Sequence, residues 1–265
     1  MIRLSISNIG WDAIDDIKIY DLMNQYGFEG LEIAPTRIFV ENPYDRIDDA
    51  FEWKNKLMAE YGLSVPSMQS IWYGRTENIF ESGESNKALC EYTQKAILFA
   101  EAVGCHNLVF GCPRNRNVPE GKDSGDGERF FRTIGEFATC HNTVIGMEAN
   151  PPIYNTNYIN TTQEAINLIE KVNSKGFRLN LDVGTMIYNN EDVDVIKNKI
   201  SIINHVHISE PGLKVIEKRN IHVELNNILQ DGGYDGYVSI EMGKNQDRSS
   251  IENTMEYIKA IFGRG

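Results

Sequence analysis

The chain has 265 residues, a length that suits one large α/β domain with a substantial core. Hydrophobic residues make up 41% and aromatic residues 10%, which is ordinary for a soluble globular protein. The formal net charge of −12 argues against a nucleic-acid partner, because phosphate binding requires a basic face.

The cysteines and the N-terminus bear on the cellular compartment. Cys90, Cys105, Cys112 and Cys140 lack CxxC spacing, so neither a zinc knuckle nor a disulfide framework is indicated. The first residues enter a strand without the apolar region of a signal peptide. No apolar run reaches the ~18 residues needed to cross a bilayer. We therefore expect a reduced, cytoplasmic protein with no membrane contact.

Strand-like and helix-like periods alternate along the whole chain. The first four expected strands cover residues 3–7, 30–34, 63–69 and 107–111, and the last four end at Glu148, Asp182, His207 and Glu241. The expected helices cover residues 14–26, 46–61, 85–103, 128–141, a segment opened by the capping box from Thr161 to Glu164, and then 192–199, 222–230 and 249–262. The polar segment 121–127 is expected to be an exposed loop.

Eight strand–helix units without a linker predict a single (β/α)8 TIM barrel over residues 1–265. The alternative is a doubly wound open sheet, which would need a glycine-rich nucleotide loop after the first strand. The sequence from Asn8 to Asp12 reads N-I-G-W-D and has no GxGxxG. The barrel is therefore favoured.

Four consecutive expected strands end in an acidic or imidazole side chain, at separations of 34, 25 and 34 residues. In a TIM barrel such ends meet at one rim. The fold does not require a carboxylate there, because we expect branched apolar side chains inside the barrel. Each group alone could be a helix cap or a satisfied polar group, but their recurrence on four strands predicts one shared site.

Glu148, Asp182, His207 and Glu241 together form an oxygen-rich donor set that suits Mn²⁺ or Mg²⁺, with Co²⁺ or Zn²⁺ as alternatives. Such an ion can hold the carbonyl and hydroxyl oxygens of a sugar and stabilise an enediolate. Proton transfer next to the carbonyl needs a base, and epimerisation needs an acid on the other face. Glu148 and Glu241 could form that pair, which predicts a divalent-metal-dependent sugar isomerase or epimerase.

Four motifs carry a resemblance that extends over essentially the whole chain. They are E-A-N-P from Glu148, N-L-D-V-G around Asp182, H-V-H-I-S-E from His205 to Glu210, and G-Y-V-S-I-E-M from Gly236. The sequence resembles the xylose isomerase-like TIM-barrel superfamily, the sugar phosphate isomerase/epimerase group that includes ketose 3-epimerases.

The resemblance implies that the four strand-end residues bind one divalent ion, with Mn²⁺ expected, and that the two glutamates move the proton. It also implies that His207 is the histidine ligand. His205 lies two residues back on the same strand face and is the alternative ligand.

The chain differs from the ketose 3-epimerases at three places where the resemblance implies polar groups that hold the substrate's hydroxyls. Thr185, Leu213 and the region of Tyr154 stand there instead. The sugar therefore stays open. Cationic side chains follow two strand ends and favour a substrate with an anionic or otherwise modified group; they are Lys214, Arg114 and Arg116.

Further side chains follow the strand ends and are candidates for contact with a small sugar or sugar derivative, with ordinary loop packing as the alternative. They are Gln69, Trp72, Arg114, Asn150, Glu210 and Lys214. Glu32 on the second strand either supports a metal ligand or is an ordinary buried hydrogen-bonding group, and the sequence does not choose between these roles.

Other function classes remain open. The same superfamily includes dehydratases of keto-polyols such as an inosose, and a non-catalytic sugar-binding barrel would also retain the fold. An endonuclease IV-type repair enzyme is disfavoured, because that class needs a basic face and more than five histidines. A homo-oligomeric state is also open.

Overall fold

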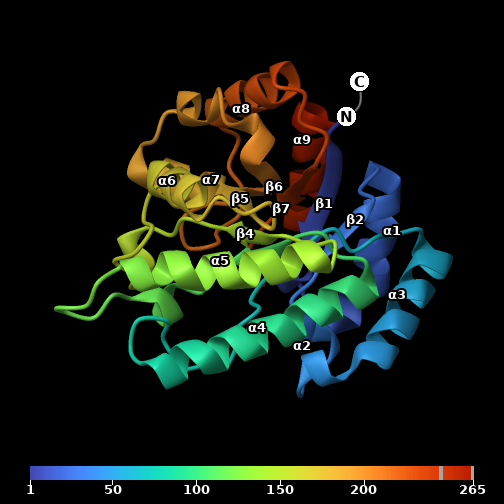
Figure 1. Ribbon diagram of the computed structural model, residues 1–265. Coiled ribbons are helices and arrows are strands. Elements are labelled where there is room, and N and C mark those ends of the chain that lie inside the picture. Colours follow the sequence, from blue (N-terminus) through green and yellow to red (C-terminus); the bar gives the residue numbers. More distant parts are fainter. Residues whose placement is uncertain (245–246, 264–265) are drawn as a thin grey trace.

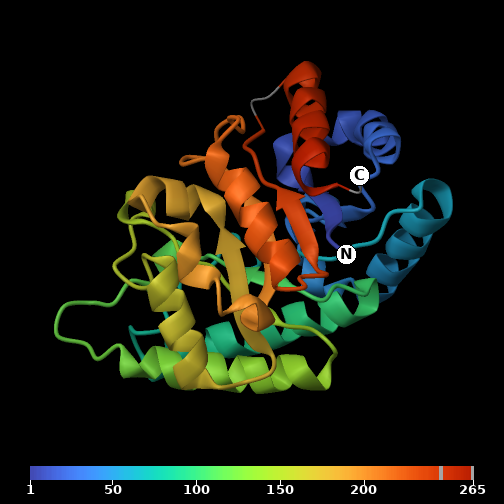
Figure 2. The same cartoon turned by 90° about the horizontal axis from the view of Figure 1, so that it is seen from above.

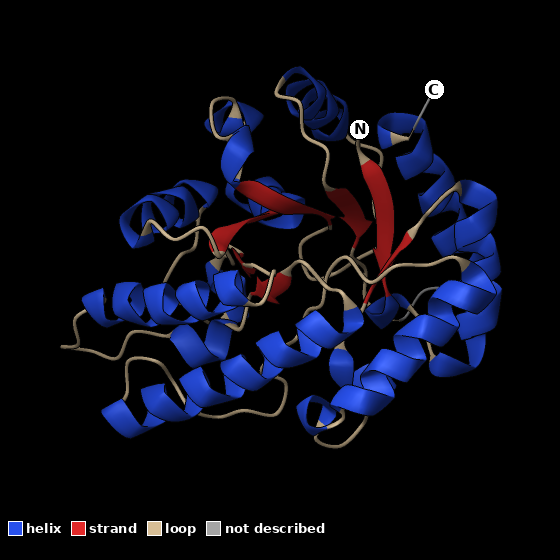
Figure 3. Ribbon diagram, turned by 45° about the vertical axis from the view of Figure 1, so that its right-hand side comes forward, coloured by secondary structure: helices blue, strands red, loops and turns tan. Residues whose placement is uncertain are grey.

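The computed structural model describes residues 1–244 and 247–263. Over these residues, seven parallel strands form one curled sheet in the order β2-β1-β7-β6-β5-β4-β3. Figures 1 and 3 show the strands at the centre of the molecule with helices around them. The strands are β1 (Arg3–Ser7), β2 (Gly30–Glu32), β3 (Leu108–Phe110), β4 (Ile145–Met147), β5 (Phe177–Asp182), β6 (Ile203–Ile208) and β7 (Tyr237–Ile240).

The predicted strand at residues 63–69 is an extended segment that closes the barrel between β2 and β3. Leu31 donates its backbone N–H to Ser64 O at 2.8 Å, and Val109 donates to Met68 O at 2.8 Å. Isolated parallel bridges replace a continuous ladder here, and Pro66 within the segment has no N–H to donate. The TIM-barrel prediction is confirmed.

The described part of the chain contains nine α-helices. They are α1 (Asp16–Tyr26), α2 (Pro35–Ile38), α3 (Ile47–Tyr61), α4 (Gly83–Val103), α5 (Gly125–Cys140), α6 (Thr162–Val172), α7 (Val183–Asn189), α8 (Asn220–Asp231) and α9 (Arg248–Phe262). The predicted capping box is present, since Thr161 accepts from Glu164 N and Glu164 reaches back. Helices α4 and α5 lie side by side on one flank (Figures 1 and 2). Within residues 1–244 and 247–263, no helix has both the length and the apolar character that crossing a bilayer requires.

Two local predictions were wrong. Residues 125–127 are the first turn of α5 and not an exposed loop; Gly127 is buried where a Cβ would lie 2.5 Å from the Tyr158 hydroxyl. The helix expected at residues 192–199 is only a 3₁₀ turn over Val193–Ile196. The helix after β5 is α7 instead, which begins directly after Asp182, whose side chain caps it by accepting from Thr185 N.

The interior of the barrel is polar, contrary to our expectation of branched apolar side chains. Outward positions such as Leu4 and Ile6 of β1 belong to the hydrophobic core under the helices. Inward positions carry small or polar groups that bond across the barrel: Gln69 Nε2 donates to Ser7 Oγ at 2.8 Å. The apolar core is therefore the layer between sheet and helices, and the barrel interior is a polar floor beneath one rim.

Candidate metal centre

The four predicted strand-end residues come together at the C-terminal rim. Glu148 follows β4, Asp182 ends β5, His207 is the fifth residue of β6 and Glu241 follows β7. Each offers one ligand atom, and these atoms all lie within 4.8 Å of one another. Parallel pairing sets their level, since Asp182 is the register partner of His207. The arrangement is a buried donor cluster that fits a divalent metal ion.

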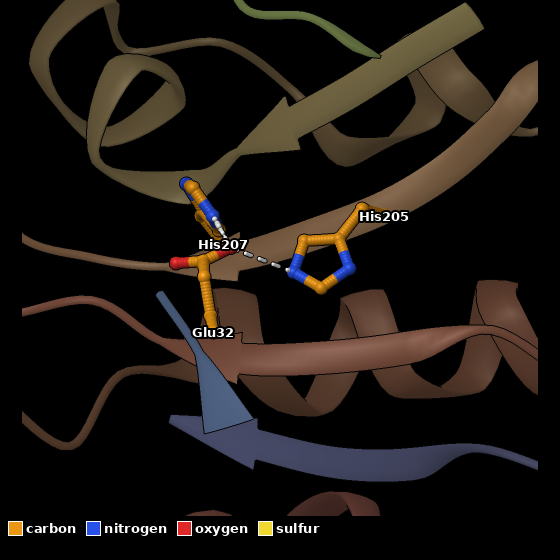
Figure 4. A group of neighbouring side chains, drawn as sticks. All are labelled: Glu32, His205 and His207. Carbon is orange, nitrogen blue, oxygen red and sulfur yellow. Dashed lines mark hydrogen bonds and ion pairs between the residues drawn. The ribbon is translucent and has the colours of Figure 1, made fainter. Parts of the chain in front are cut away.

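The imidazole of His207 is fixed by partners on both ring nitrogens. Its Nδ1 lies 3.0 Å from Glu148 Oε1 and 3.3 Å from Glu241 Oε2. Its Nε2 lies 2.8 Å from Glu32 Oε2, and Figure 4 shows the Glu32 carboxylate between His207 and His205. A hydrogen bond from Nε2–H to Glu32 leaves Nδ1 as the nitrogen that can bind an ion.

The charges around His207 favour a cation at the cluster. Burial opposes the charged imidazole, but the carboxylates of Glu32 and Glu241 raise the pKa of His207 well above its usual value. Burial and the neighbouring Glu148 and Glu241 raise the pKa of Asp182 to about 7. Carboxylates crowded in this way repel one another, and a divalent ion among them would remove that repulsion.

The side chain of Glu148 is held by two amides. Asn180 Nδ2 donates to Glu148 Oε1 at 3.0 Å, and Asn150 Nδ2 donates to Oε2 at 3.0 Å. The fully buried Arg116 in turn holds Glu148 and Asn150 together. Its Nη1 donates to Glu148 O at 2.8 Å and its Nη2 donates to Asn150 Oδ1 at 2.9 Å. Glu148 is therefore oriented before any ligand binds.

Arg116 is not available to clamp an anionic substrate, as we had expected. Its guanidinium also donates to Phe110 O and Ile159 O, both at 3.3 Å, and burial lowers its pKa to about 10. The expected anion partner Arg116 is instead a support beneath the donor cluster.

A cavity of about 160 Å³ opens beside the donor cluster. Gly111 borders it, and a Cβ at that position would lie 2.8 Å from Glu148 Oε2. The carboxylate thus approaches the backbone more closely than any larger residue would permit. The cavity is lined by Gln69, Ser70, Val109, Gly111, Cys112, Pro113, Glu148, Asn150, Tyr154, Asp182, Ser209, Leu213 and Glu241.

Of the six side chains expected to contact substrate, Gln69 and Asn150 line this cavity. Trp72 does not line it and lies in the hydrophobic core, where it packs edge-on against Phe110 and donates its indole N–H to Thr93. Although Trp72 follows the third expected strand closely in the sequence, its ring does not lie at the cavity.

The other three expected contacts lie away from the cavity lining. Glu210 is buried and accepts two hydrogen bonds from the Arg219 guanidinium at 2.7 Å, so its carboxylate is already engaged. Arg114 and Lys214 are exposed. Thr185 also turns away, since its hydroxyl donates to Ala149 O at 2.8 Å. Tyr154 and Leu213, by contrast, both line the cavity.

Backbone strain gathers at the same place. Of the non-glycine residues with positive φ in the described part of the chain, five are asparagines, which tolerate this conformation. The others are Ser70, Cys112, Ile159 and Leu213. Three of these line the cavity, and the carbonyl of Ile159 accepts from Arg116. Such clustering is typical of functional sites, where the surrounding structure holds an unfavourable backbone.

In the structure, Glu32 supports the candidate ligand His207, a role that the sequence left open. Its Oε1 accepts from Gln69 Nε2 at 3.1 Å, and its Oε2 accepts from His207. His205 Nε2 lies 3.2 Å from the same oxygen. His205 is not one of the four clustered donors, but Glu32, His205 and His207 form a second group whose ligand atoms lie within 4.8 Å of one another. In the sequence, the alternation of the second strand placed Glu32 on the inward face. The same alternation would have identified Asn180 as a neighbour of the site, because it lies two residues before Asp182 on the same strand face.

Replacing Glu32 by glutamine is expected to weaken Mn²⁺ binding about 10- to 100-fold, the usual loss when the partner of a ligating histidine is removed. A glutamine amide can donate to His207 Nε2 and leave the proton on Nδ1, the nitrogen that must bind the ion. Calorimetric titration of metal-free protein measures the change, with the exposed Glu41→Gln as control. Unchanged affinity in a folded Glu32→Gln variant contradicts this role.

The fold and the donor cluster together define a TIM barrel with a candidate divalent-metal site. A family model described as "Xylose isomerase-like TIM barrel" matches residues 20–261. The chain belongs to this family. No curated protein matches the chain.

Solved structures with the same fold match nearly the whole chain. A D-psicose 3-epimerase, crystallised in the presence of D-fructose, has a TM-score of 0.80 at 15% identity and covers 99% of this chain and 100% of its own. The 3-keto-D-glucoside 4-epimerase of E. coli has a TM-score of 0.76 at 15% identity, with 98% and 100% covered. A probable 3-DHS dehydratase of Bacillus anthracis has a TM-score of 0.68 at 16% identity, with 99% of each chain covered. At such identities the likeness shows the fold alone.

Proposed function

We propose that this protein is a divalent-metal-dependent isomerase or epimerase that moves a proton at the carbon next to the carbonyl of a small sugar or sugar derivative. The observation that carries the proposal is the cluster of Glu148, Asp182, His207 and Glu241 at the C-terminal rim, with a cavity beside it. Two of the structural neighbours are epimerases that act on sugars by their names, which supports this class of substrate.

A divalent ion held by these four residues, with Mn²⁺ expected, would polarise the substrate carbonyl and stabilise the negative charge that develops on its oxygen. Asp182 accepts from Thr185 N at 2.6 Å and from the Ser209 hydroxyl. His207 is fixed by Glu32. We assign these two residues the role of ligands.

Glu241 and Glu148 have the second role of moving the proton. Glu241 takes a proton from the carbon next to the carbonyl, and the electron pair forms an enediolate; the other glutamate gives a proton back to carbon. In the metal-free protein, burial together with the nearby Glu148 and Glu32 raises the pKa of Glu241. Both oxygens of Glu148 accept amide hydrogen bonds, which hold its carboxylate in one orientation.

The test pairs metal content with proton exchange. Wild-type protein refolded or purified with Mn²⁺ is expected to bind one ion per chain, and Asp182→Ala is expected to lose most of it. Exchange of a carbon-bound proton of the sugar with solvent deuterium, followed by NMR over a panel of ketoses, should disappear in the same variant. A wild-type protein that binds no divalent ion, or an Asp182→Ala variant that binds it normally, contradicts the proposal. Loss of water from the sugar instead of exchange would identify a dehydratase of the keto-polyol type.

A further inference from the structure

We infer that the substrate is uncharged and poor in hydroxyl groups, as in a deoxy ketose, and that its apolar part lies against a wall formed by Val109, Cys112, Pro113 and Leu213. This inference rests on the proposed function and specifies its substrate class. These four residues, here called the apolar wall, line the cavity together with three of the four metal-binding candidates, Glu148, Asp182 and Glu241.

Leu213 is the clearest indication. Its φ of 54° lies in the left-handed region, which a branched apolar residue rarely adopts. The backbone is locked there, since Leu213 N donates to Glu210 O at 2.9 Å and Gly243 N donates to Leu213 O at 2.8 Å. An asparagine or glycine would adopt this conformation at lower cost. The half-buried leucine side chain is therefore not explained by local folding, and it borders the cavity.

Cys112 repeats this pattern after another strand. It also has positive φ, 40°, and lines the same cavity shortly after β3. Burial raises the pKa of its thiol to about 12, so the side chain is neutral and behaves as a small apolar group. Val109 of β3 and Pro113 extend the same surface. Leu213 and Cys112, both with positive φ, thus place apolar side chains at the cavity.

The polar groups of the cavity are mostly engaged with the protein. Both ends of the Asn150 amide are used, by Glu148 and Arg116. The Ser209 hydroxyl donates to Asp182 and accepts from Gly184 N. Gln69 Nε2 donates to Ser7 and Glu32. A substrate rich in hydroxyls would find few free partners here, and each unpaired buried hydroxyl lowers affinity.

The Tyr154 hydroxyl is an exception among these polar groups. It accepts from Gly212 N at 2.9 Å, which leaves its own proton free to donate. This donor suits one substrate oxygen beyond those that an ion would hold. The free polar groups therefore match a substrate with few hydroxyls.

The charge of the cavity disfavours an anionic substrate, in contrast to our expectation from the sequence. None of the lining residues in the described chain is a lysine or arginine. The acidic side chains of the cavity are Glu148, Asp182 and Glu241. A phosphate or carboxylate on the substrate would face these side chains with no lysine or arginine beside it.

Three achiral probes with the same hydroxyketone head test the inference without knowledge of the sugar's stereochemistry. They are hydroxyacetone, with a methyl group, dihydroxyacetone, with a hydroxyl, and dihydroxyacetone phosphate. On Mn²⁺-loaded protein, hydroxyacetone should bind about three- to tenfold more tightly than dihydroxyacetone, as burial of one methyl group predicts. The phosphate should bind most weakly. Ligand-observed NMR titration gives the three dissociation constants.

Leu213→Asn is the matched variant, because asparagine accepts the left-handed backbone and offers polar atoms in place of the apolar side chain. It should reverse the order of hydroxyacetone and dihydroxyacetone while the affinity for Mn²⁺ stays unchanged. Tightest binding of the phosphate, an unchanged order in Leu213→Asn, or failure of all three probes to bind overturns the inference. Absence of Mn²⁺ binding would instead contradict the proposed function, so the two failures are distinguishable.

Discussion

Replacing Glu241 by glutamine should slow exchange of the substrate's carbon-bound proton with solvent by about 10²- to 10⁴-fold, the usual contribution of a positioned acid or base. An amide cannot take up the proton, yet its oxygen can still bind a metal ion. Mn²⁺ affinity should therefore fall much less than the exchange rate. The measurement is deuterium incorporation followed by NMR at saturating Mn²⁺, with metal content determined on the same samples.

The control for this substitution is Glu217→Gln, which changes an exposed glutamate whose partner is the surface residue Arg219. This variant should retain both exchange and metal binding. Near-normal exchange in Glu241→Gln at full metal occupancy would show that Glu241 is not the base. Equal losses of metal and exchange would make it a ligand only.

The repeat of strand ends was the part of the site that the sequence could predict. Parallel pairing forces the C-terminal ends of neighbouring strands to one level, so an acidic or imidazole group at each of four ends must meet the others. Glu148, Asp182, His207 and Glu241 do meet in the structure. The predicted arrangement of eight strand–helix units is also present, although the third strand, which contains Pro66, forms only isolated bridges.

Loop side chains could not be placed in the same way. Trp72, Glu210 and Arg116 each follow a strand end by a few residues, and the backbone there turns freely. Trp72 entered the core, Glu210 formed a bidentate pair with Arg219, and Arg116 turned beneath the site. Position after a strand end fixes the rim but not the direction of a side chain.

The polar barrel interior was missed for a different reason. A period of two in a strand shows which residues share a face, but it does not say which face lies inside the barrel. In β1 the apolar face, with Leu4 and Ile6, packs under the helices, and the face with Ser5 and Ser7 lies inside. The polar interior connects Glu32 and Gln69 to His207, so the same alternation that builds the fold also positions a metal-binding candidate.

Replacing Arg116 by methionine should lower the free energy of unfolding by roughly 2–6 kcal/mol, since about two buried acceptors would lose a donor at ~1–3 kcal/mol each. Those acceptors are Glu148 O and Asn150 Oδ1. The other two carbonyls that Arg116 contacts keep backbone donors, because Phe110 O also accepts from Glu148 N and Ile159 O from Asn150 N. Methionine keeps much of the length and volume of the buried chain, so the loss reports mainly on hydrogen bonds.

Urea unfolding of metal-free protein measures this change, and Arg114→Met is its matched control, because Arg114 is exposed in the same 3₁₀ turn. The control should change stability by less than about 0.5 kcal/mol. Mn²⁺ affinity should also fall in Arg116→Met, because Asn150 would no longer be held against Glu148. Burial lowers the pKa of Arg116, which shows that its charge is opposed by its surroundings and that its hydrogen bonds must offset the cost. A loss below about 1 kcal/mol would mean that methionine packing compensates for those bonds, and that Arg116 is not the support of the site.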